Sequence, residues 1–420
     1  MQVIFRHLRM PDGTASDILV TDGIIAAIGS GLAAQQPDTD VVDGQGALAL
    51  PGLVDGHVHL DKTLTGLSWM PHPAEPERLS RIETEKRLRS EFPLSVEERA
   101  SNLLRQCVAL GTTAIRTHVD IDPEIGLANL HGIVAAKEAF KDIVDIQIVA
   151  FPQSGVMRCP GTAELLEAAL QEGSDLLGGI DPLTLDDDLD GQLDTLFKIA
   201  ERRGVGIDAH IHAADPNGLI EITAMAERVS AYGITGGVTV SHGFSLGAAT
   251  EDDLQRVADL MAQSGMMLVT HGGGNAPLPP VKRLRNLGVT VFAGNDNVRD
   301  TWSPFGNGDM LERAMLLAWR AGFRTDEDLA IAFDTASAAG AQALNLEGYG
   351  LAVGCRANFF CVPSETLAEA VVSRPTRSFV VKSGRVVAQD GEILQAPFDR
   401  EATPMIRKNS VLSGRHPSQQ

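Results

Sequence analysis

The sequence of 420 residues predicts an α/β fold, a (β/α)8 TIM barrel with a small β-sandwich domain formed by both termini. Three observations predict it. Short apolar runs alternate with helical patterns through the middle of the chain, and strand-like sequence rich in turns marks both ends. In addition, a polar residue stands at the end of each apolar run. A doubly wound open sheet is the alternative for the middle region.

The middle region, residues 53–345, contains the eight predicted barrel strands. Helical patterns separate the strands, and three of these patterns end in a glycine, as helices often do. The predicted strands are 53–60, 112–120, 145–153, 175–181, 205–212, 237–243, 266–272 and 289–296. The three helices that end in glycine are 162–173, 194–204 and 251–265.

The two ends of the chain share a different pattern. Residues 1–52 and 346–400 consist of short β runs broken by Asp-Gly and Gly-Ser turns, which are typical of hairpins. We expect these segments to pair into one β-sandwich domain beside the (β/α)8 barrel over 53–345. Residues 401–420 are polar and are expected to form a C-terminal tail.

The composition limits the possible partners. The formal net charge is −20 at pH 7, so neither nucleic acid nor an anionic membrane is expected to bind. No apolar run reaches the roughly 18 residues of a membrane span, and the first residues lack the pattern of a secretion signal. We expect a cytoplasmic homo-oligomer that acts on a small molecule. Its four scattered cysteines are expected to be reduced.

All eight predicted strands end in polar residues, at the side of a TIM barrel where active sites lie. His57 and His59 are two residues apart, so their side chains point to the same side of the strand. A shared metal ion explains this arrangement, and a hydrogen-bonded histidine pair is the alternative. The other strand-end residues are His118 with Asp120, Gln153, Asp181, His210 with His212, His242, His271 and Asp296.

Buried imidazoles and carboxylates cost free energy unless they find partners, so their number favours a metal site. Histidine and carboxylate ligands suit Zn²⁺ or Fe²⁺ and leave a position for water. We expect His57, His59, His210 and Asp296 to hold one divalent ion. A metal-bound hydroxide would attack an electrophilic carbon while His242 or Asp296 accepts its proton, which makes hydrolysis the expected reaction.

Six sequence motifs resemble those of the amidohydrolase superfamily, and within it those of the cytosine deaminases. They are HVHLDK, RTHVDID, IVAFPQSG, IDAHIHA, VSHG and FAGNDNVRDTWSPFGNGDML, and the resemblance runs from about residue 45 to 390. It implies a (β/α)8 barrel, a β-sandwich and a single catalytic Fe²⁺ or Zn²⁺ held by the same four ligands. The resemblance also makes His242 the catalytic histidine and places Gln153 and Trp302 at the substrate.

Two departures from the wider superfamily refine the expected chemistry. Members with two metal ions usually carry a carboxylated lysine at the end of strand 4. The corresponding segment, LLGGIDPLT, contains no lysine, so a site with one metal ion is expected. Cytosine deaminases have a proton-shuttling glutamate three residues after the strand 5 histidine, where this sequence has Ala213. Because alanine cannot transfer a proton, His212 is the expected substitute and Asp215 the second candidate. The alternative is that His212 only binds substrate or packs at the rim.

Further residues are expected around the reacting centre. Lys62 is expected to pair with a carboxylate, and the charged segment 64–92 either covers the barrel mouth or forms a solvated helix face. The residues expected to bind substrate are Gln153, His118, His271, Trp302 and Asp181.

The sequence therefore predicts a metal-dependent hydrolase of C–N bonds other than peptide bonds. An aminohydrolase, or deaminase, acting on a small N-heterocycle such as cytosine or a related pyrimidine or triazine is expected. A cyclic or linear amide hydrolase on the same scaffold is the first alternative. A non-catalytic binding relative is the second.

Overall fold

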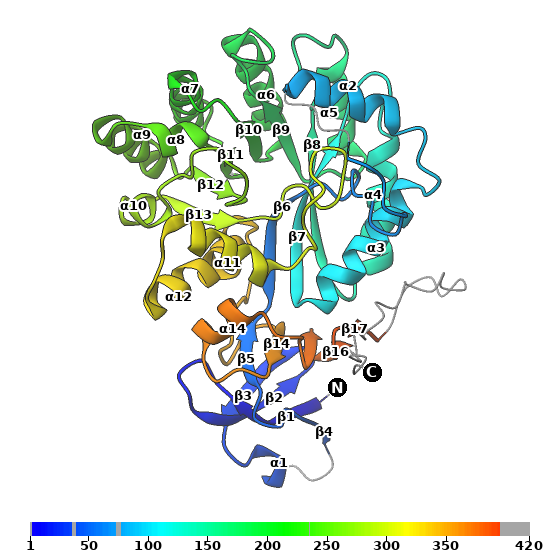
Figure 1. Cartoon of the computed structure of the whole chain (residues 1–420), viewed down its shortest axis with the longest axis vertical. Coiled ribbons are helices and arrows are strands. Elements are labelled where there is room, and N and C mark those ends of the chain that lie inside the picture. Colours follow the sequence, from blue (N-terminus) through cyan, green and yellow to red (C-terminus); the bar gives the residue numbers. More distant parts are fainter. Residues whose placement is uncertain (1, 36–38, 73–76, 235, 395–420) are drawn as a thin grey trace, which may run out of the picture.

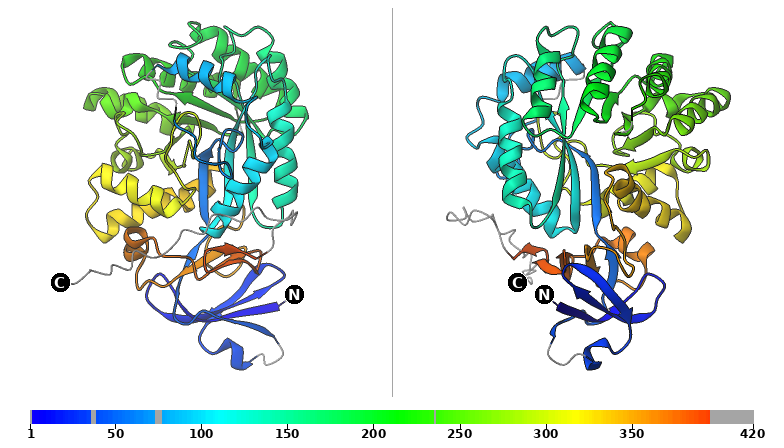
Figure 2. Two further views of the ribbon diagram at one scale, coloured as in Figure 1. Left: turned by 45° about the vertical axis from the view of Figure 1, so that its right-hand side comes forward. Right: turned by 180° about the vertical axis from the view of Figure 1, so that it is seen from behind.

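The computed structural model describes residues 2–35, 39–72, 77–234 and 236–394, so the predicted tail at 401–420 lies outside the described residues. The chain forms a barrel and, at one end of it, a sheet built from both terminal regions (Figure 1, Figure 2). This arrangement matches the predicted fold class.

Eight parallel strands form the barrel in chain order, and each is hydrogen-bonded to the next. A parallel bridge between Val58 and Asp296 joins the first strand to the segment after the last one. The amide of Asp296 also donates to the carbonyl oxygen of His57 at 2.7 Å. This closure confirms the barrel and excludes the open sheet. The strands are β6 (Leu53–Val58), β7 (Thr112–Asp120), β8 (Asp145–Phe151), β9 (Leu176–Ile180), β10 (Ile207–Ile211), β11 (Val238–His242), β12 (Met267–Thr270) and β13 (Thr290–Ala293).

Helices follow the strands and cover the outside of the barrel (Figure 1). In α9, for example, buried apolar residues recur every three or four positions and form a stripe that faces the core. Gly204 and Gly265 cap the C-termini of α6 and α9 with positive φ, as their sequences predict. The helices of the barrel are α2 (Arg78–Leu88), α3 (Val96–Ala109), α4 (Ala128–Phe140), α5 (Thr162–Gln171), α6 (Leu189–Arg203), α7 (Pro216–Tyr232), α8 (Phe244–Ala248), α9 (Glu251–Ser264), α10 (Val281–Asn286), α11 (Met310–Ala321), α12 (Asp326–Thr335) and α13 (Ala338–Ala343).

The two termini meet in one nine-stranded sheet. Strand β14 pairs antiparallel with β5, which leads directly into the first barrel strand. Phe5 packs against Phe359 and Phe379 in the apolar core of this sheet. The sheet therefore holds the start and the end of the chain together below the barrel. Its strands are β1 (Gln2–Arg9), β2 (Ala15–Thr21), β3 (Ile24–Gly29), β4 (Asp40–Asp43), β5 (Leu48–Pro51), β14 (Phe359–Val362), β15 (Phe379–Lys382), β16 (Arg385–Gln389) and β17 (Glu392–Ile393). Short helices α1 (Leu32–Gln35) and α14 (Leu367–Ser373) complete this end of the molecule.

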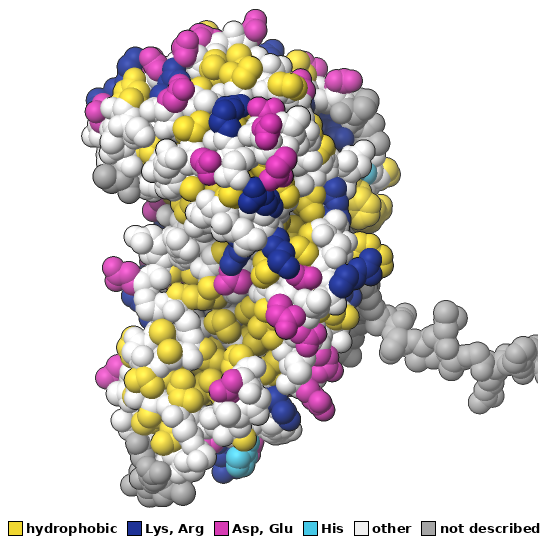
Figure 3. Space-filling model, turned by 90° about the vertical axis from the view of Figure 1, so that its left-hand side faces the viewer, with side chains coloured by type: hydrophobic (Ala, Val, Ile, Leu, Met, Phe, Trp, Pro, Cys, Tyr) yellow, Lys and Arg dark blue, Asp and Glu magenta, His cyan; other side chains and the backbone are white. Residues whose placement is uncertain are grey.

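The surface mixes charges of both signs. On the face in Figure 3, basic and acidic side chains are interspersed around apolar patches, and no continuous basic area is visible. Among the described residues, no helix combines the length and the apolar character needed to cross a membrane.

Candidate metal centre

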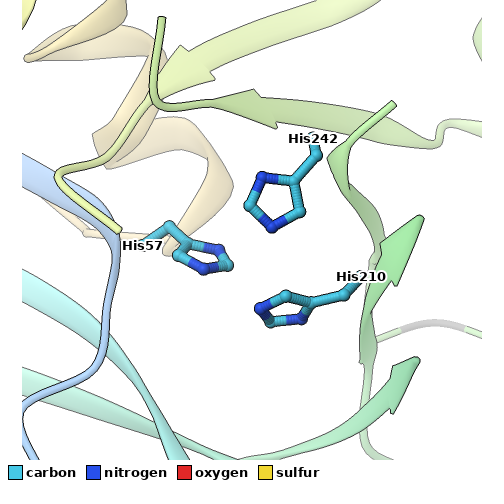
Figure 4. Close-up of side chains that lie close together, drawn as sticks. All are labelled: His57, His210 and His242. Carbon is cyan, nitrogen blue, oxygen red and sulfur yellow. The ribbon is translucent and has the colours of Figure 1, made fainter. Parts of the chain in front are cut away.

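Side chains from the carboxyl ends of the barrel strands converge inside the barrel. His57 comes from β6, His210 from β10 and His242 from β11, and the three rings point toward one another (Figure 4). Ring centroids lie 4.7 Å apart for His57 and His210, 5.0 Å for His210 and His242, and 5.3 Å for His57 and His242. The Asp296 Oδ1 atom lies 3.5 Å from His57 Nε2 and 3.4 Å from His59 Nε2.

These groups have the chemistry of a metal site. Among the described residues, potential ligand atoms lie within 4.8 Å of one another in four sets: His57–His59–Asp296, His57–His210–His242, His57–His118–Asp208 and His242–His271–Asp296. The four predicted ligands are divided between the first two sets, which share His57. Within the described residues, both ring nitrogens of His210 and His242 and the Nε2 atom of His57 are buried without a hydrogen-bond partner. Buried nitrogens of this kind are costly unless something binds them. These histidine nitrogens and the Asp296 carboxylate therefore fit a divalent cation.

The electrostatics favour the protonation states that metal ligation requires. Burial lowers the pKa of His59, His210 and His242 well below the ordinary value, so their rings are neutral at neutral pH. Burial would raise the pKa of the Asp296 carboxyl, but His57 and His59 outweigh this effect and hold its pKa well below the ordinary value. Neutral imidazoles and an ionised carboxylate are the forms that bind a cation.

The backbone is strained at three strand ends of this site. Asp181, His242 and Asp296 have φ values of 36°, 75° and 61°, in the left-handed region that residues with a side chain avoid. Each of them turns the chain at the point where its side chain enters the barrel. Strain of this kind concentrates at functional sites, because the surrounding structure must hold it.

His212 lies beside the metal centre and is held by Asp181. Asp181 accepts hydrogen bonds at 2.7 Å from the His212 amide and from His212 Nδ1. Burial would raise the pKa of Asp181, but His212 and Arg78 outweigh this effect and lower its pKa. The ionised carboxylate can only accept, so Nδ1 carries a proton and Nε2 stays available. The His212 ring stacks on His242 with centroids 4.3 Å apart.

A second buried cluster surrounds Lys62. Lys62 Nζ lies 3.0 Å from Asp120 and 3.5 Å from Glu85, which confirms that Lys62 pairs with carboxylates. It also donates to the Gln153 side-chain oxygen. The Gln153 amide nitrogen donates to Glu85 at 3.0 Å, and the Trp302 ring N–H donates to the same carboxylate. The predicted substrate contacts Gln153 and Trp302 thus belong to one hydrogen-bonded group.

Helix α2 links both clusters to the segment between the first two barrel strands. Arg78, near its start, donates to Asp181 at 2.7 Å, and Glu85, near its end, contacts Lys62. The described part of segment 64–92 therefore contacts strand-end residues of the barrel, which favours the covering role over a solvated helix face.

The other two expected substrate contacts differ in exposure. His271 is 19% exposed, and its Nε2 atom lies 4.0 Å from Asp296. His118 is fully buried, stacks on His57 with centroids 4.0 Å apart, and lies 3.3 Å from Asp208. His118 therefore packs behind a predicted metal ligand. His57 and His59 have ring centroids 5.3 Å apart and no hydrogen bond to each other among the described contacts, which disfavours a simple histidine pair.

Comparison with known proteins identifies the family. A model of the amidohydrolase family matches residues 40–388. The chain belongs to this family. It is 34% identical over 364 residues to the N-isopropylammelide isopropyl amidohydrolase of Pseudomonas sp. strain ADP, covering 84% of this chain and 89% of the relative.

Two solved structures are similar to this amidohydrolase over most of the chain. The N-isopropylammelide isopropylaminohydrolase of Burkholderia multivorans ATCC 17616 is 43% identical, with a TM-score of 0.91 over 94% of this chain and 100% of that one. A 5-methylcytosine deaminase of Klebsiella pneumoniae is 29% identical, with a TM-score of 0.81 over 93% and 98% of the two chains. The resemblance seen in the sequence motifs is confirmed, and the protein is a hydrolase of the amidohydrolase superfamily.

Several residues of the site in this amidohydrolase escaped the sequence reasoning. Arg116, Asp208 and Ser241 form a buried network behind His57, and Arg78 and Glu85 reach the site from α2. One signal was available for two of them. Arg116 and Asp208 each stand two residues before a strand-end histidine, so they share its side of the strand.

Proposed function

We propose that this amidohydrolase cleaves the bond between a ring carbon and an exocyclic nitrogen on a small N-heterocycle. The expected substrates are amino-substituted or alkylamino-substituted triazines and pyrimidines. The ring stays intact, an oxygen from water replaces the nitrogen, and ammonia or an amine leaves. Relatives named for the removal of an alkylamine from a triazine support the alkylamino class, since they are 34% and 43% identical over most of their length.

The residues that would hold the cofactor are His57, His59, His210 and Asp296, with one divalent ion, Zn²⁺ or Fe²⁺. Three imidazoles and one carboxylate suit either metal and leave a position for water. A bound ion of this kind would lower the pKa of a water molecule and so supply the nucleophile at neutral pH. The rest of the reaction depends on groups of the protein.

The reaction needs two proton transfers, one from the attacking water and one to the leaving nitrogen. His242 and Asp296 come from neighbouring positions around the ligand cluster and would take the proton of the attacking water. When the C–N bond breaks, the leaving nitrogen needs a proton, because an amide anion is too poor a leaving group. His212 would take up at Nε2 the proton released by the attacking water and pass it to the leaving nitrogen, while Asp181 holds its Nδ1–H.

The surroundings of His212 are the observation that carries the proposal. Its Nδ1 is bound 2.7 Å from a buried carboxylate and its ring stacks on His242. Position 213, where cytosine deaminases place their proton-shuttling glutamate, is a buried alanine. The site thus retains a group for protonating the leaving nitrogen, although at a different position.

The substrate ring would be held by the groups above the ligand cluster. The Gln153 amide and the Trp302 ring N–H donate to Glu85 in the structure, so they would exchange these bonds for the oxygen or ring-nitrogen acceptors of an oxo-heterocycle when it binds. His271, beside Asp296, would contact the opposite edge of the ring. We assign Asp181 and His118, which are fully buried, to holding His212 and His57 rather than to direct contact.

The test follows the products of the purified, metal-loaded protein. Amino- and alkylamino-triazines, pyrimidines, pterins and cyclic amides are incubated in ¹⁸O-labelled water and analysed by mass spectrometry. Release of ammonia or an alkylamine, with one ¹⁸O atom in an intact ring, supports the proposal. A new carboxylate from an opened ring or a cleaved amide would instead make the protein an amidase. Freshly purified protein without metal and without turnover would indicate a binding relative.

A further inference from the structure

A chain of buried hydrogen bonds runs behind His57, on the side away from Asp296. The Nδ1 atom of His57 lies 2.9 Å from the Ser241 hydroxyl oxygen. The same hydroxyl donates to Oδ1 of Asp208 at 2.6 Å. All three side chains are buried, with at most 2% of their surface exposed. The contacts connect β6, β11 and β10.

The direction of each hydrogen bond follows from the chemistry of the groups. An ionised carboxylate only accepts, so the Ser241 hydroxyl must give its single proton to Asp208. The Ser241 oxygen is then free only to accept, and its neighbour His57 Nδ1 must be the donor. A neutral imidazole carries one ring proton, so the proton on Nδ1 leaves a lone pair on Nε2. Nε2 is the atom that faces Asp296 in the ligand cluster.

Arg116 fixes the far end of this chain. Its guanidinium donates to Asp208 Oδ2 at 2.9 Å and is itself fully buried. The nitrogen that binds Asp208, Nη1, also donates to Thr239, and the other two nitrogens donate to Gln147 and to the carbonyl oxygen of Ala343. A buried arginine held by four hydrogen bonds cannot move without breaking several of them. Asp208 therefore stays ionised and in place.

We propose that Ser241, held by Asp208, is a positioning residue that fixes the tautomer and orientation of His57 for metal binding. The proposal rests on the metal site of the proposed function, and it assigns a role to residues outside the ligand set. His57 differs in this respect from its neighbours, because the Nδ1 atoms of His59 and His210 have no partner among the described residues. Partners of this kind raise the affinity of a histidine ligand and orient its ring.

Metal affinity tests the proposal directly. The Zn²⁺ dissociation constant is measured by competition with a chromogenic chelator for the unmutated protein, Ser241→Ala and Ser245→Ala. Ser245 lies four residues further on, is equally buried, and its hydroxyl has no partner among the described residues, so it controls for removal of a buried hydroxyl. We expect Ser241→Ala to bind Zn²⁺ about 10- to 100-fold more weakly, and Ser245→Ala to bind as the unmutated protein does. Equal affinity in all three proteins would overturn the proposal.

The tautomer itself provides a second readout that needs no Ser241 variant. Two-bond ¹H–¹⁵N correlation spectra of protein labelled with ¹⁵N-histidine distinguish the two neutral tautomers, with the His57 signals assigned by their loss in His57→Asn. The proposal expects the proton of His57 on Nδ1 in metal-free protein, and a proton on Nε2 would overturn it. Absence of Zn²⁺ binding by the unmutated protein would overturn the proposed metal site, whereas the tautomer result in metal-free protein would still decide the role of Ser241.

Discussion

The imidazole rings of His212 and His242 stack at the mouth of the barrel, with centroids 4.3 Å apart and planes inclined by 22°. They come from neighbouring strand ends and have different surroundings. Both nitrogens of His242 lack a partner among the described residues, whereas His212 gives its Nδ1 proton to Asp181. Two parallel imidazoles can therefore serve two proton transfers, one at the attacking water and one at the leaving nitrogen.

Replacement of His212 tests whether it passes a proton to the leaving nitrogen. We expect His212→Asn to lower kcat by about 100-fold or more, because the leaving nitrogen loses its proton donor. The bound metal should remain unchanged, which elemental analysis can verify alongside amine release. The exposed His131 provides a matched control, and His131→Asn should retain full turnover. A rise in KM with unchanged kcat would mean that His212 only binds substrate.

Asp296 is expected to behave differently because it is an anionic ligand. Asp296→Asn should abolish nearly all activity and release the metal, since the neutral amide binds a divalent cation far more weakly. The metal content after dialysis, measured together with turnover, checks both effects. Asp252→Asn, on the exposed start of α9, is the control and should keep its metal. Full metal retention in Asp296→Asn would remove Asp296 from the ligand set.

The barrel and the convergence of its strand ends could be predicted from the sequence. The apolar runs and the spacing of His57 and His59 contain this information locally, since alternate residues share one side of a strand. The glycines after α6 and α9 are similarly local signals, and both have the expected left-handed conformation.

The network behind His57 could not be predicted in the same way. Ser241 and His57 are 184 residues apart in sequence. They are in contact only because the barrel brings β11 and β6 together across its interior. The position of Ser241 beside His210 depends on the register between β10 and β11. A single sequence does not contain that register.

The contributions of α2 were unpredictable for a related reason. Arg78 and Glu85 lie in a long connection whose sequence pattern suits a covering helix and a solvated one equally. Their roles follow from contacts with Asp181 and Gln153, which come from strands much further along the chain. The left-handed backbone of Asp181, His242 and Asp296 was equally hidden, because Asp and His adopt it more often than most residues but still only rarely, so residue type alone does not mark such a position.

The buried pairing of Lys62 predicts a large effect on stability. Burial alone would lower the pKa of Lys62, but Asp120 and Glu85 outweigh it and raise the pKa above the ordinary value. Lys62→Met keeps the length of the side chain but leaves both carboxylates without their cation. We expect the free energy of unfolding to fall by about 3–5 kcal/mol, measured by urea denaturation.

The control for this variant is Lys86→Met, on the same helix as Glu85. Lys86 pairs with Glu124, whose side chain is 60% exposed, so the loss should stay below about 1 kcal/mol. Adding Asp120→Asn to Lys62→Met should recover part of the lost stability, because one of the two buried acidic groups that lost their cation is removed. Similar losses in the two lysine variants would contradict a special cost for the buried pairing of Lys62.

Glu221 on α7 predicts a dependence of stability on pH. It is fully buried and accepts a hydrogen bond from the Leu183 amide at 2.9 Å, and burial raises its pKa to about 7 from an ordinary value of 4.5. Between these values the folded protein holds a proton that the unfolded chain has lost. The free energy of unfolding should therefore fall as the pH rises through this range, by about 3 kcal/mol from this group, and level off above pH 7.

Glu221→Gln should remove this part of the decline, as measured by urea denaturation at about pH 5 and about pH 8. Glu227→Gln changes an exposed residue of the same helix and should leave the decline as it is. An unchanged decline in Glu221→Gln would show that the proton taken up on folding sits elsewhere.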